Sequence, residues 1–119
     1  YYPKHVVRIP DEDWPEDVSN AFAEINFPIY LKMQGPSEFG IVGDASLKDW
    51  DVTSELNKLE IPFLSIGAEH DTMDPKQMEW MANEVQNGSY LHCLNGSHMA
   101  MWDDTENYFD GLINFIKNL

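Results

Sequence analysis

The sequence predicts an α/β fold in which a β-α-β-α segment of a parallel sheet follows a front part made of helices and loops. Two short runs of strand length are present, residues 61–66 and 89–94, and the first is nearly all apolar, as in a strand that is buried on both faces of a parallel sheet. A helical pattern over residues 75–85 lies between them, and another follows the second run. Strands that alternate with helices in this way are typical of parallel sheets.

The front part is expected to contain only helices and loops. Prolines punctuate residues 1–13, which predicts a connector with an extended piece at residues 5–9. A helix then begins near Asp13, a possible N-cap, and carries apolar residues at helical spacing. A second helical stretch over residues 28–34 is ended by Gly35-Pro36. Residues 35–46 contain three glycines and are expected to form a loop.

The back half is expected to alternate helices and strands. Residues 49–59 predict a short helix, and Ile61 to Ile66 predicts a buried strand that Gly67 ends. The next helix is expected from Pro75 to Val85, with Asp74 as its N-cap, because proline is favoured at the first helical position.

The second strand, from Ser89 to Leu94, is followed by a final helix that Asp103 or Asp104 caps. An apolar stripe runs along that helix, formed by Tyr108, Leu112, Phe115 and Ile116. Two strands alone would leave both sheet edges open along very apolar sequence. We therefore expect further strands from outside this chain, or an assembly of chains, to cover those edges.

The composition excludes several classes of function. The chain has 119 residues and a formal net charge of -14, from 7 Lys and Arg against 21 Asp and Glu, so nucleic acids and anionic membranes are expected to be repelled. A cationic ligand, such as the amino end of a peptide, would be attracted. The single Cys93 excludes an internal disulfide, and no apolar run is long enough to span a bilayer. The cytoplasm is the working expectation for the compartment.

The strongest candidate site is a pair formed by Asp71 and His98. Each follows a predicted strand, and the carboxyl ends of parallel strands are where catalytic groups collect in open α/β sheets. An acid after one strand and a histidine after the next are the last two members of a Ser-Asp-His triad in hydrolase order. The alternatives are that Asp71 caps a turn and that His98 is a solvated loop residue. Asp74 is a rival acid, but its place before Pro75 suits an N-cap.

A metal site is the competing interpretation of the same region. Five residues there are plausible ligands by type: His70, Asp71, His92, Cys93 and His98. Their spacing matches no compact zinc pattern, and strand alternation would turn His92 and Cys93 to opposite faces. We therefore predict no metal and no cofactor.

The nucleophile of such a triad is absent from this sequence, which contains no Gly-x-Ser-x-Gly. A complete enzyme of this fold needs roughly 250 residues. With Tyr1 as its first residue, the chain is therefore expected to be the C-terminal part of a longer enzyme, whose missing N-terminal part supplies the serine and the oxyanion hole.

The sequence resembles the proline iminopeptidases, which are prolyl aminopeptidases of the α/β-hydrolase fold. The likeness is carried by Met33-Gln-Gly-Pro-Ser-Glu-Phe39, by Lys48-Asp-Trp-Asp51, and by the two segments Gly67-Ala-Glu-His-Asp-Thr-Met-Asp-Pro75 and Asn95-Gly-Ser-His-Met-Ala-Met-Trp102. The first segment is the more specific to these aminopeptidases, whereas the last two occur in many α/β-hydrolases.

The resemblance implies that residues 1–43 are part of a helical cap and that residues 44–119 are the C-terminal part of the α/β-hydrolase core. It implies a catalytic acid at Asp71, a catalytic histidine at His98, and a cap glutamate at Glu38 that binds the amine of a peptide substrate with a free N-terminus. Some relatives carry a second amine-binding glutamate directly after the acid. Here that position is Thr72, and Glu69 is a possible substitute.

The resulting expectation is a serine aminopeptidase that releases an N-terminal residue, by preference proline, from peptides. Two alternatives stay open at this point. One is another α/β-hydrolase chemistry, such as that of an esterase or an epoxide hydrolase. The other is a non-catalytic binding module derived from such an enzyme, which would use its open sheet edge for association.

Overall fold

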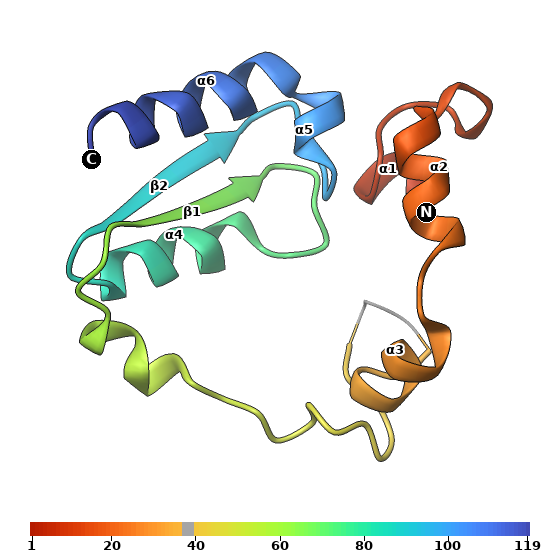
Figure 1. Cartoon of the computed structure of the whole chain (residues 1–119), viewed down its shortest axis with the longest axis horizontal. Helices are drawn as coiled ribbons and strands as arrows, with labels where there is room; N and C mark the ends of the chain where they lie inside the picture. The colour runs from red at the N-terminus through yellow and green to blue at the C-terminus, as the bar shows by residue number, and fades with distance from the viewer. Residues whose placement is uncertain (37–39) are drawn as a thin grey trace. The chain divides into compact units, whose positions relative to one another are not determined.

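The computed structural model describes residues 1–36 and 40–119, which form two compact units (Figure 1). The strand unit consists of residues 1–12 and 53–119, and the helical unit consists of residues 13–52. The expected boundary between cap and core near Gly43 concerns the complete protein and stays a prediction.

The strand unit is built on two parallel strands, β1 (Phe63–Ala68) and β2 (Gly88–Cys93), whose register pairs Phe63 with Gly88 and Ala68 with Cys93. The helix α4 (Pro75–Glu84) connects them, and α6 (Thr105–Lys117) follows the short helix α5 (Ala100–Asp103). The positions of two glycines show that the helices cover opposite faces. Gly67 of β1 faces Met78 of α4, whereas Gly111 of α6 lies against Leu91 of β2 (Figure 1). The expected β-α-β-α order is confirmed.

The strand β1 begins and ends two residues later than the sequence predicts, and Gly67 lies inside it rather than at its end. The reason is the close approach of a neighbouring side chain. A Cβ atom at Gly67 would lie 2.7 Å from the hydroxyl oxygen of Tyr90, which is on the paired strand. Glycine therefore lets the tyrosine ring pack across β1 instead of stopping the strand.

The α4 helix begins as expected, because the Asp74 carboxylate accepts a hydrogen bond from the N–H of Lys76 (2.9 Å). The last helix also begins after Asp104, but no side-chain cap forms there. The Asp104 carboxylate instead accepts hydrogen bonds from the N–H of Asn95 and from the side-chain amide of Asn107. Asp104 thus joins the start of α6 to the loop after β2.

One hydrophobic cluster of the strand unit lies at the carboxyl ends of the two strands. Three buried residues, Ala68, Cys93 and Ala100, form it, and Ile66, Leu91 and Tyr108 pack against them. Tyr108 belongs to the predicted stripe of α6, but Ile116 at the far end of that stripe is exposed. In the described part of the chain the sheet has two strands, so each strand has one edge that pairs with no other strand.

Cys93 is expected to resist thiol reagents as long as the protein is folded. Its side chain is completely buried, and burial, together with the charges of Asp104 and Asp103, raises its pKa to about 11. Because the thiolate is the reactive form, only about one molecule in 10⁴ is reactive near pH 7. Mass spectrometry of the peptide that contains Cys93, after exposure to a maleimide, checks this. Labelling should require denaturant, and rapid labelling of native protein would contradict the expectation.

The first twelve residues are a packed part of the strand unit rather than a loose connector. They form the short helix α1 (Tyr2–His5) and the 3₁₀ turn η1 (Asp11–Asp13), of which Asp13 already belongs to the helical unit. The extended piece predicted over residues 5–9 is therefore wrong, because His5 is helical, Val6 is in a turn, and the chain bends at residues 8 and 9. Val6 and Val7 are buried, which anchors this segment by apolar contact.

The helical unit contains α2 (Glu16–Ala23) and α3 (Phe27–Met33). Asp13 does not cap α2, because Pro15 occupies the N-cap position and no side-chain cap bond forms. The α3 helix is capped by Asn26, whose side-chain oxygen accepts from the N–H of Ile29 (3.3 Å). The short helix predicted over residues 49–59 is reduced to the 3₁₀ helix η2 (Thr53–Lys58) of the strand unit.

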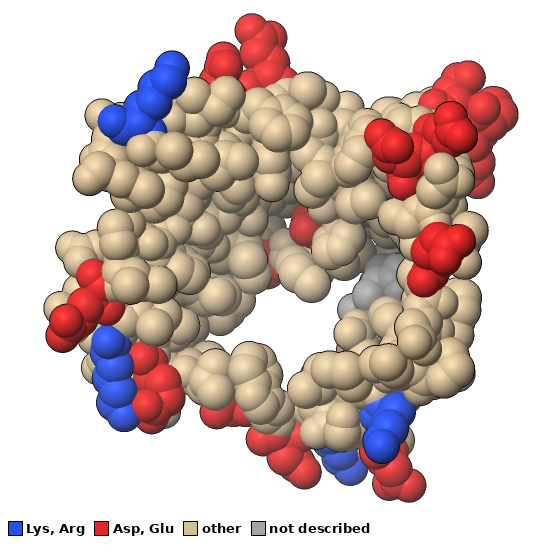
Figure 2. All heavy atoms as spheres, in the orientation of Figure 1, with Lys and Arg blue, Asp and Glu red and all other residues tan. Residues whose placement is uncertain are grey.

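Among charged side chains, acidic ones are more frequent than basic ones. Figure 2 shows them scattered over this face and gathered most densely around η1 and the start of α2, with few basic side chains between them. On this face, the described residues form no basic patch of the kind that binds phosphate backbones. Among the described residues, no helix is both long enough and apolar enough to cross a membrane.

Candidate active site

The parallel strands bring two loops of the strand unit together. Asp71 lies three residues beyond the end of β1, and His98 lies five residues beyond the end of β2. Backbone hydrogen bonds continue the pairing past the strands: the N–H of Glu69 donates to the carbonyl of Cys93 (3.1 Å), and the N–H of His70 donates to that of Gly96 (3.0 Å). The loops are therefore joined at their bases before the two side chains meet.

Asp71 and His98 are directly hydrogen-bonded. The Nδ1 atom of His98 lies 3.2 Å from Oδ1 and 3.3 Å from Oδ2 of Asp71. An ionised carboxylate can only accept, so Nδ1 carries the hydrogen and Nε2 is the ring nitrogen that can take up a proton. The Asp71 side chain is 13% exposed and that of His98 is 37% exposed. The pair thus combines a sheltered acid with an imidazole that reaches solvent.

The electrostatics of Asp71 favour its ionised form. Burial of the carboxyl raises its pKa, but hydrogen bonds from His98 and from the N–H of Met73 (3.1 Å), together with the charge on His98, outweigh burial. The pKa of Asp71 therefore lies below its ordinary value of 3.8. A carboxylate that stays ionised near neutral pH can stabilise a histidinium beside it.

The stability that Asp71 contributes is expected to be lost in acid. Because its folded pKa is lower than its unfolded pKa, the contribution is complete above about pH 5 and falls as the pH drops below 3.8 through the folded pKa. We expect the difference in free energy of unfolding between the native protein and Asp71→Asn to shrink over that range. Chemical denaturation at several pH values measures it, and a difference that grows with acidity would reverse the sign.

The turn that carries His98 is held by buried contacts, although its Gly-Ser composition is typical of a flexible turn. Ser97 is 1% exposed. Its N–H donates to Oδ1 of Asp103 (2.9 Å), and its hydroxyl contacts Asp103 and the carbonyl of Val6. Gly96 is also buried, and a Cβ atom there would lie 2.8 Å from the Cβ of Ala100. Gly96 and Ser97 of the turn are thus buried, whereas His98 is exposed.

A hollow lies beside the pair within the strand unit. It is lined by Asp71 and His98 and by apolar side chains that include Ile66, Met101 and Tyr108. Met101 follows His98 in the chain and lines the hollow, whereas Met99 contributes its backbone N–H to a bond with the N-terminal segment. The hollow places an apolar wall next to the two polar groups.

Glu69 and His92 form a separate pair. Their side chains lie 3.2 Å apart between Oε2 of Glu69 and Nε2 of His92. Both line a second hollow, together with Lys76, Glu79 and Tyr90, and not the one that Asp71 lines. Glu69 is thus bonded to His92 at a different hollow from the one beside the Asp71–His98 pair. This position argues against Glu69 as the substitute for an amine-binding glutamate.

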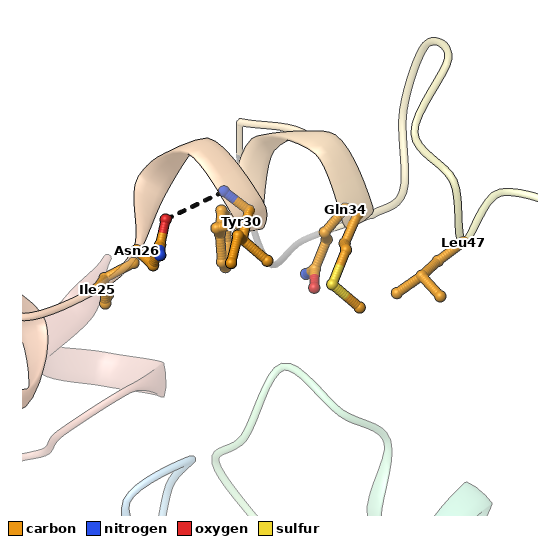
Figure 3. A pocket seen from close by; sticks show the side chains of 7 residues that line it. Ile25, Asn26, Tyr30, Gln34 and Leu47 are labelled. Atoms are coloured by element: carbon orange, nitrogen blue, oxygen red, sulfur yellow. Dashed lines mark hydrogen bonds between the residues drawn. The ribbon is translucent and has the colours of Figure 1, made fainter.

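The predicted amine-binding residue Glu38 lies outside the described residues. The helix that precedes it in the chain borders an apolar hollow of the helical unit, with Ile25, Tyr30, Met33 and Leu47 in its lining (Figure 3). Two residues with amide side chains, Asn26 and Gln34, also belong to this lining. The hollow is suited to an apolar group.

The competing metal interpretation has no geometric support in residues 1–36 and 40–119, where no group of three or more His, Cys, Asp or Glu side chains could hold an ion. As predicted from strand alternation, His92 and Cys93 point apart. His92 is bonded to Glu69 at the surface, whereas Cys93 is in the core.

Sequence comparison identifies the relatives of this chain. The proline iminopeptidase of Elizabethkingia meningoseptica is 46% identical over 119 residues, and that of Chitinophaga pinensis is 44% identical over 119 residues. Each match covers all of this chain and 39% of the relative. In sequence, the chain belongs to the proline iminopeptidase family. A more distant proline iminopeptidase, from Saccharolobus solfataricus, is 32% identical and also matches the whole chain. No family profile matches this chain.

Solved structures agree with the family assignment. The proline iminopeptidase of Mycobacterium smegmatis superposes with a TM-score of 0.85 at 27% identity, over 98% of this chain and 38% of that protein. The crystal structure of VinJ superposes with a TM-score of 0.86 at 30% identity, over 99% of this chain and 39% of that one. The predicted fold class, part of an α/β-hydrolase, is confirmed. The chain spans about 39% of the length of the curated proline iminopeptidases it matches.

Sequence reasoning selected Asp71 and His98, which the structure brings together, but it missed the contacts that hold them. His5, Arg8 and Asp103 bond to the same two loops. The two consecutive valines beside them, Val6 and Val7, were the available signal, since valine is a residue type that is often buried.

Proposed function

We propose that this chain is the C-terminal part of a serine aminopeptidase that hydrolyses the bond after an N-terminal proline or similar residue. One observation carries the proposal: the hydrogen-bonded pair of Asp71 and His98 at the ends of neighbouring parallel strands, in a chain whose relatives are named proline iminopeptidases. The serine nucleophile and the oxyanion hole belong to the part of the enzyme outside this chain.

In the proposed mechanism His98 moves the protons and Asp71 supports it. Nε2 of His98 takes the proton from the serine hydroxyl as the serine oxygen bonds to the substrate carbonyl carbon. The imidazolium, stabilised by the Asp71 carboxylate, then gives that proton to the leaving amine as the peptide bond breaks. A water molecule repeats the sequence on the acyl-enzyme: His98 removes its proton and returns it to the serine oxygen, which releases the free amino acid.

We propose that residues 1–43 are part of a helical cap in the complete enzyme and that Glu38 binds the positively charged amine of the substrate from this cap. A carboxylate in a sheltered pocket attracts that amine and limits how much chain can extend beyond it. The negative surface of the chain would favour the approach of such a substrate. We retain the cytoplasm as the proposed compartment.

The missing N-terminal part of the same enzyme is the proposed partner of this chain. It would supply the strand that pairs with an open edge of the two-stranded sheet. Without it, the 119-residue chain should be inactive. An assay of the pure chain on a prolyl chromogenic amide tests this statement, because turnover would show that no outside serine is needed.

The proposed activity is tested with the complete protein on three substrates: proline p-nitroanilide, the same amide with its amine acetylated, and a simple p-nitrophenyl ester. We expect turnover of the free amide and little of the acetylated one, since the amine is the recognised group. Hydrolysis of the ester without that of the free amide would support an esterase instead. Inactivity on all three substrates would indicate a binding module.

A further inference from the structure

The N-terminal segment lies against the turn that carries His98, although the two are far apart in the sequence. The N–H of His98 donates to the carbonyl of His5 (3.1 Å), and the N–H of Met99 donates to the carbonyl of Val6 (2.8 Å). Val6 and Val7 are buried, so the segment is fixed by apolar contact as well. The backbone of the proposed catalytic histidine is therefore held by residues 5 and 6.

The side chain of His5 reaches the other loop. Its Nδ1 atom lies 2.8 Å from the carbonyl oxygen of His70, the residue directly before Asp71. A carbonyl oxygen can only accept, so Nδ1 of His5 carries the hydrogen. The imidazole is also packed against the ring of Tyr1, with 4.8 Å between ring centroids. His5 thus bonds the acid loop through its ring and the histidine loop through its backbone.

Further bonds hold the same segment in place. Oδ1 of Asp103 accepts from the N–H of Ser97, and Oδ2 accepts from the N–H of Arg8, both at 2.9 Å. The Arg8 guanidinium donates to the carbonyl of Asn95 (2.9 Å). Because these partners lie on either side of the His98 turn, the N-terminal segment and the turn behave as one packed body.

We propose that His5 is a positioning residue that sets the spacing of the Asp71–His98 pair. This inference rests on the proposed function, since it assigns His5 a role in the same site. The strands hold only the bases of the two loops, whereas His5 joins them next to the pair itself. A small misplacement is costly, because a shift of about 1 Å in catalytic geometry lowers rates by as much as about 10²-fold.

The test compares three substitutions of His5 in the complete protein. His5→Ala removes the bond to His70, and His5→Phe removes it but keeps an aromatic ring against Tyr1. His5→Asn can restore the bond, because its side-chain amide hydrogens lie near the position of Nδ1–H. We expect His5→Ala and His5→Phe to lower kcat about tenfold with little change in KM, and His5→Asn to stay within about threefold of the native protein.

Rates are normalised to sites titrated with a serine-reactive phosphonate, so that loss of folded protein does not count as loss of kcat. Lys4→Ala, an exposed change in the same helix, is the matched control and should leave kcat unchanged. Equal impairment by His5→Phe and His5→Asn would overturn the proposal in favour of a general packing role. Native kcat in His5→Phe would overturn it as well.

A second readout does not depend on the substrate. The Nδ1 proton of His98 should give a downfield proton NMR resonance that disappears in Asp71→Asn. We expect this resonance to shift or broaden in His5→Phe and to be restored in His5→Asn. An unchanged resonance in His5→Phe would overturn the positioning role. If the native protein does not hydrolyse proline amides, the proposed function fails, while the resonance still decides whether His5 positions the pair.

Discussion

Replacing Asp71 by Asn in the complete protein is expected to lower kcat on a proline amide by about 10⁴-fold, the size of the effect of the corresponding change in Ser-His-Asp proteases. The carboxylate accepts from Nδ1 of His98 through both oxygens, at 3.2 and 3.3 Å. An amide can instead donate to Nδ1, which leaves the hydrogen on Nε2. His98 is then in the wrong tautomer to take the serine proton, and no anion stabilises its protonated form.

The matched control for this substitution is Asp74→Asn. It makes the same chemical change three residues later, at a carboxylate that caps α4 by accepting from the N–H of Lys76. Asparagine is an equally good N-cap, so stability and kcat should both stay close to native values. Steady-state kinetics of the two variants decide between the acids. A loss below tenfold in Asp71→Asn, or a comparable loss in Asp74→Asn, would contradict the assignment of Asp71.

The double variant Asp71→Asn with His98→Ala provides a further check. Residues that act as one unit in catalysis have strongly non-additive effects. We therefore expect the double variant to be no slower than His98→Ala alone. Losses that multiply would mean that the two residues act independently.

The largest structural effect is expected from Gly88→Ala, which should destabilise the complete protein by about 3 kcal/mol or more. A Cβ atom at Gly88 would lie 1.8 Å from the carbonyl oxygen of Ala82 and 3.1 Å from that of Val85. These are backbone atoms at the end of α4 and cannot turn aside. Gly88 is also the residue of β2 that pairs with Phe63, so moving it would disturb the register of the sheet.

Chemical denaturation measures this loss, and Ser89→Ala is its control. Ser89 is the exposed neighbour of Gly88 on the same strand, and surface substitutions of this kind are usually within about 0.5 kcal/mol of native stability. If Gly88→Ala were as stable as Ser89→Ala, the close packing of β2 against the end of α4 would be wrong.

Much of the back half was predictable because its signals are local. Proline after Asp74 marks the start of α4, and two apolar runs mark the strands within two residues of their observed positions. The candidate pair was predictable for a related reason. Parallel strands bring their carboxyl ends to one edge, so an acid and a histidine just beyond two neighbouring strands meet there.

Local signals failed where another segment supplies the deciding contact. Gly67 has the appearance of a strand end, but it lies within β1 because the ring of Tyr90 covers it. The turn around Ser97 has the composition of a flexible loop, but Asp103 bonds to it and buries it. Glycine and serine permit a flexible turn without requiring one, and tertiary contacts decide which is formed.

The sequence by itself determined the order of helices and strands in the back half, and it determined which acid and which histidine follow the two strands. Periodicity, proline placement and chain order are properties of neighbouring residues, so they can be recognised without a fold. Only the tertiary structure decided that His5 bonds to the loops of both Asp71 and His98, and that Glu69 is taken up by His92. The bond from His5 to His70 joins residues 65 positions apart, and no local pattern specifies which distant group will satisfy a given polar atom.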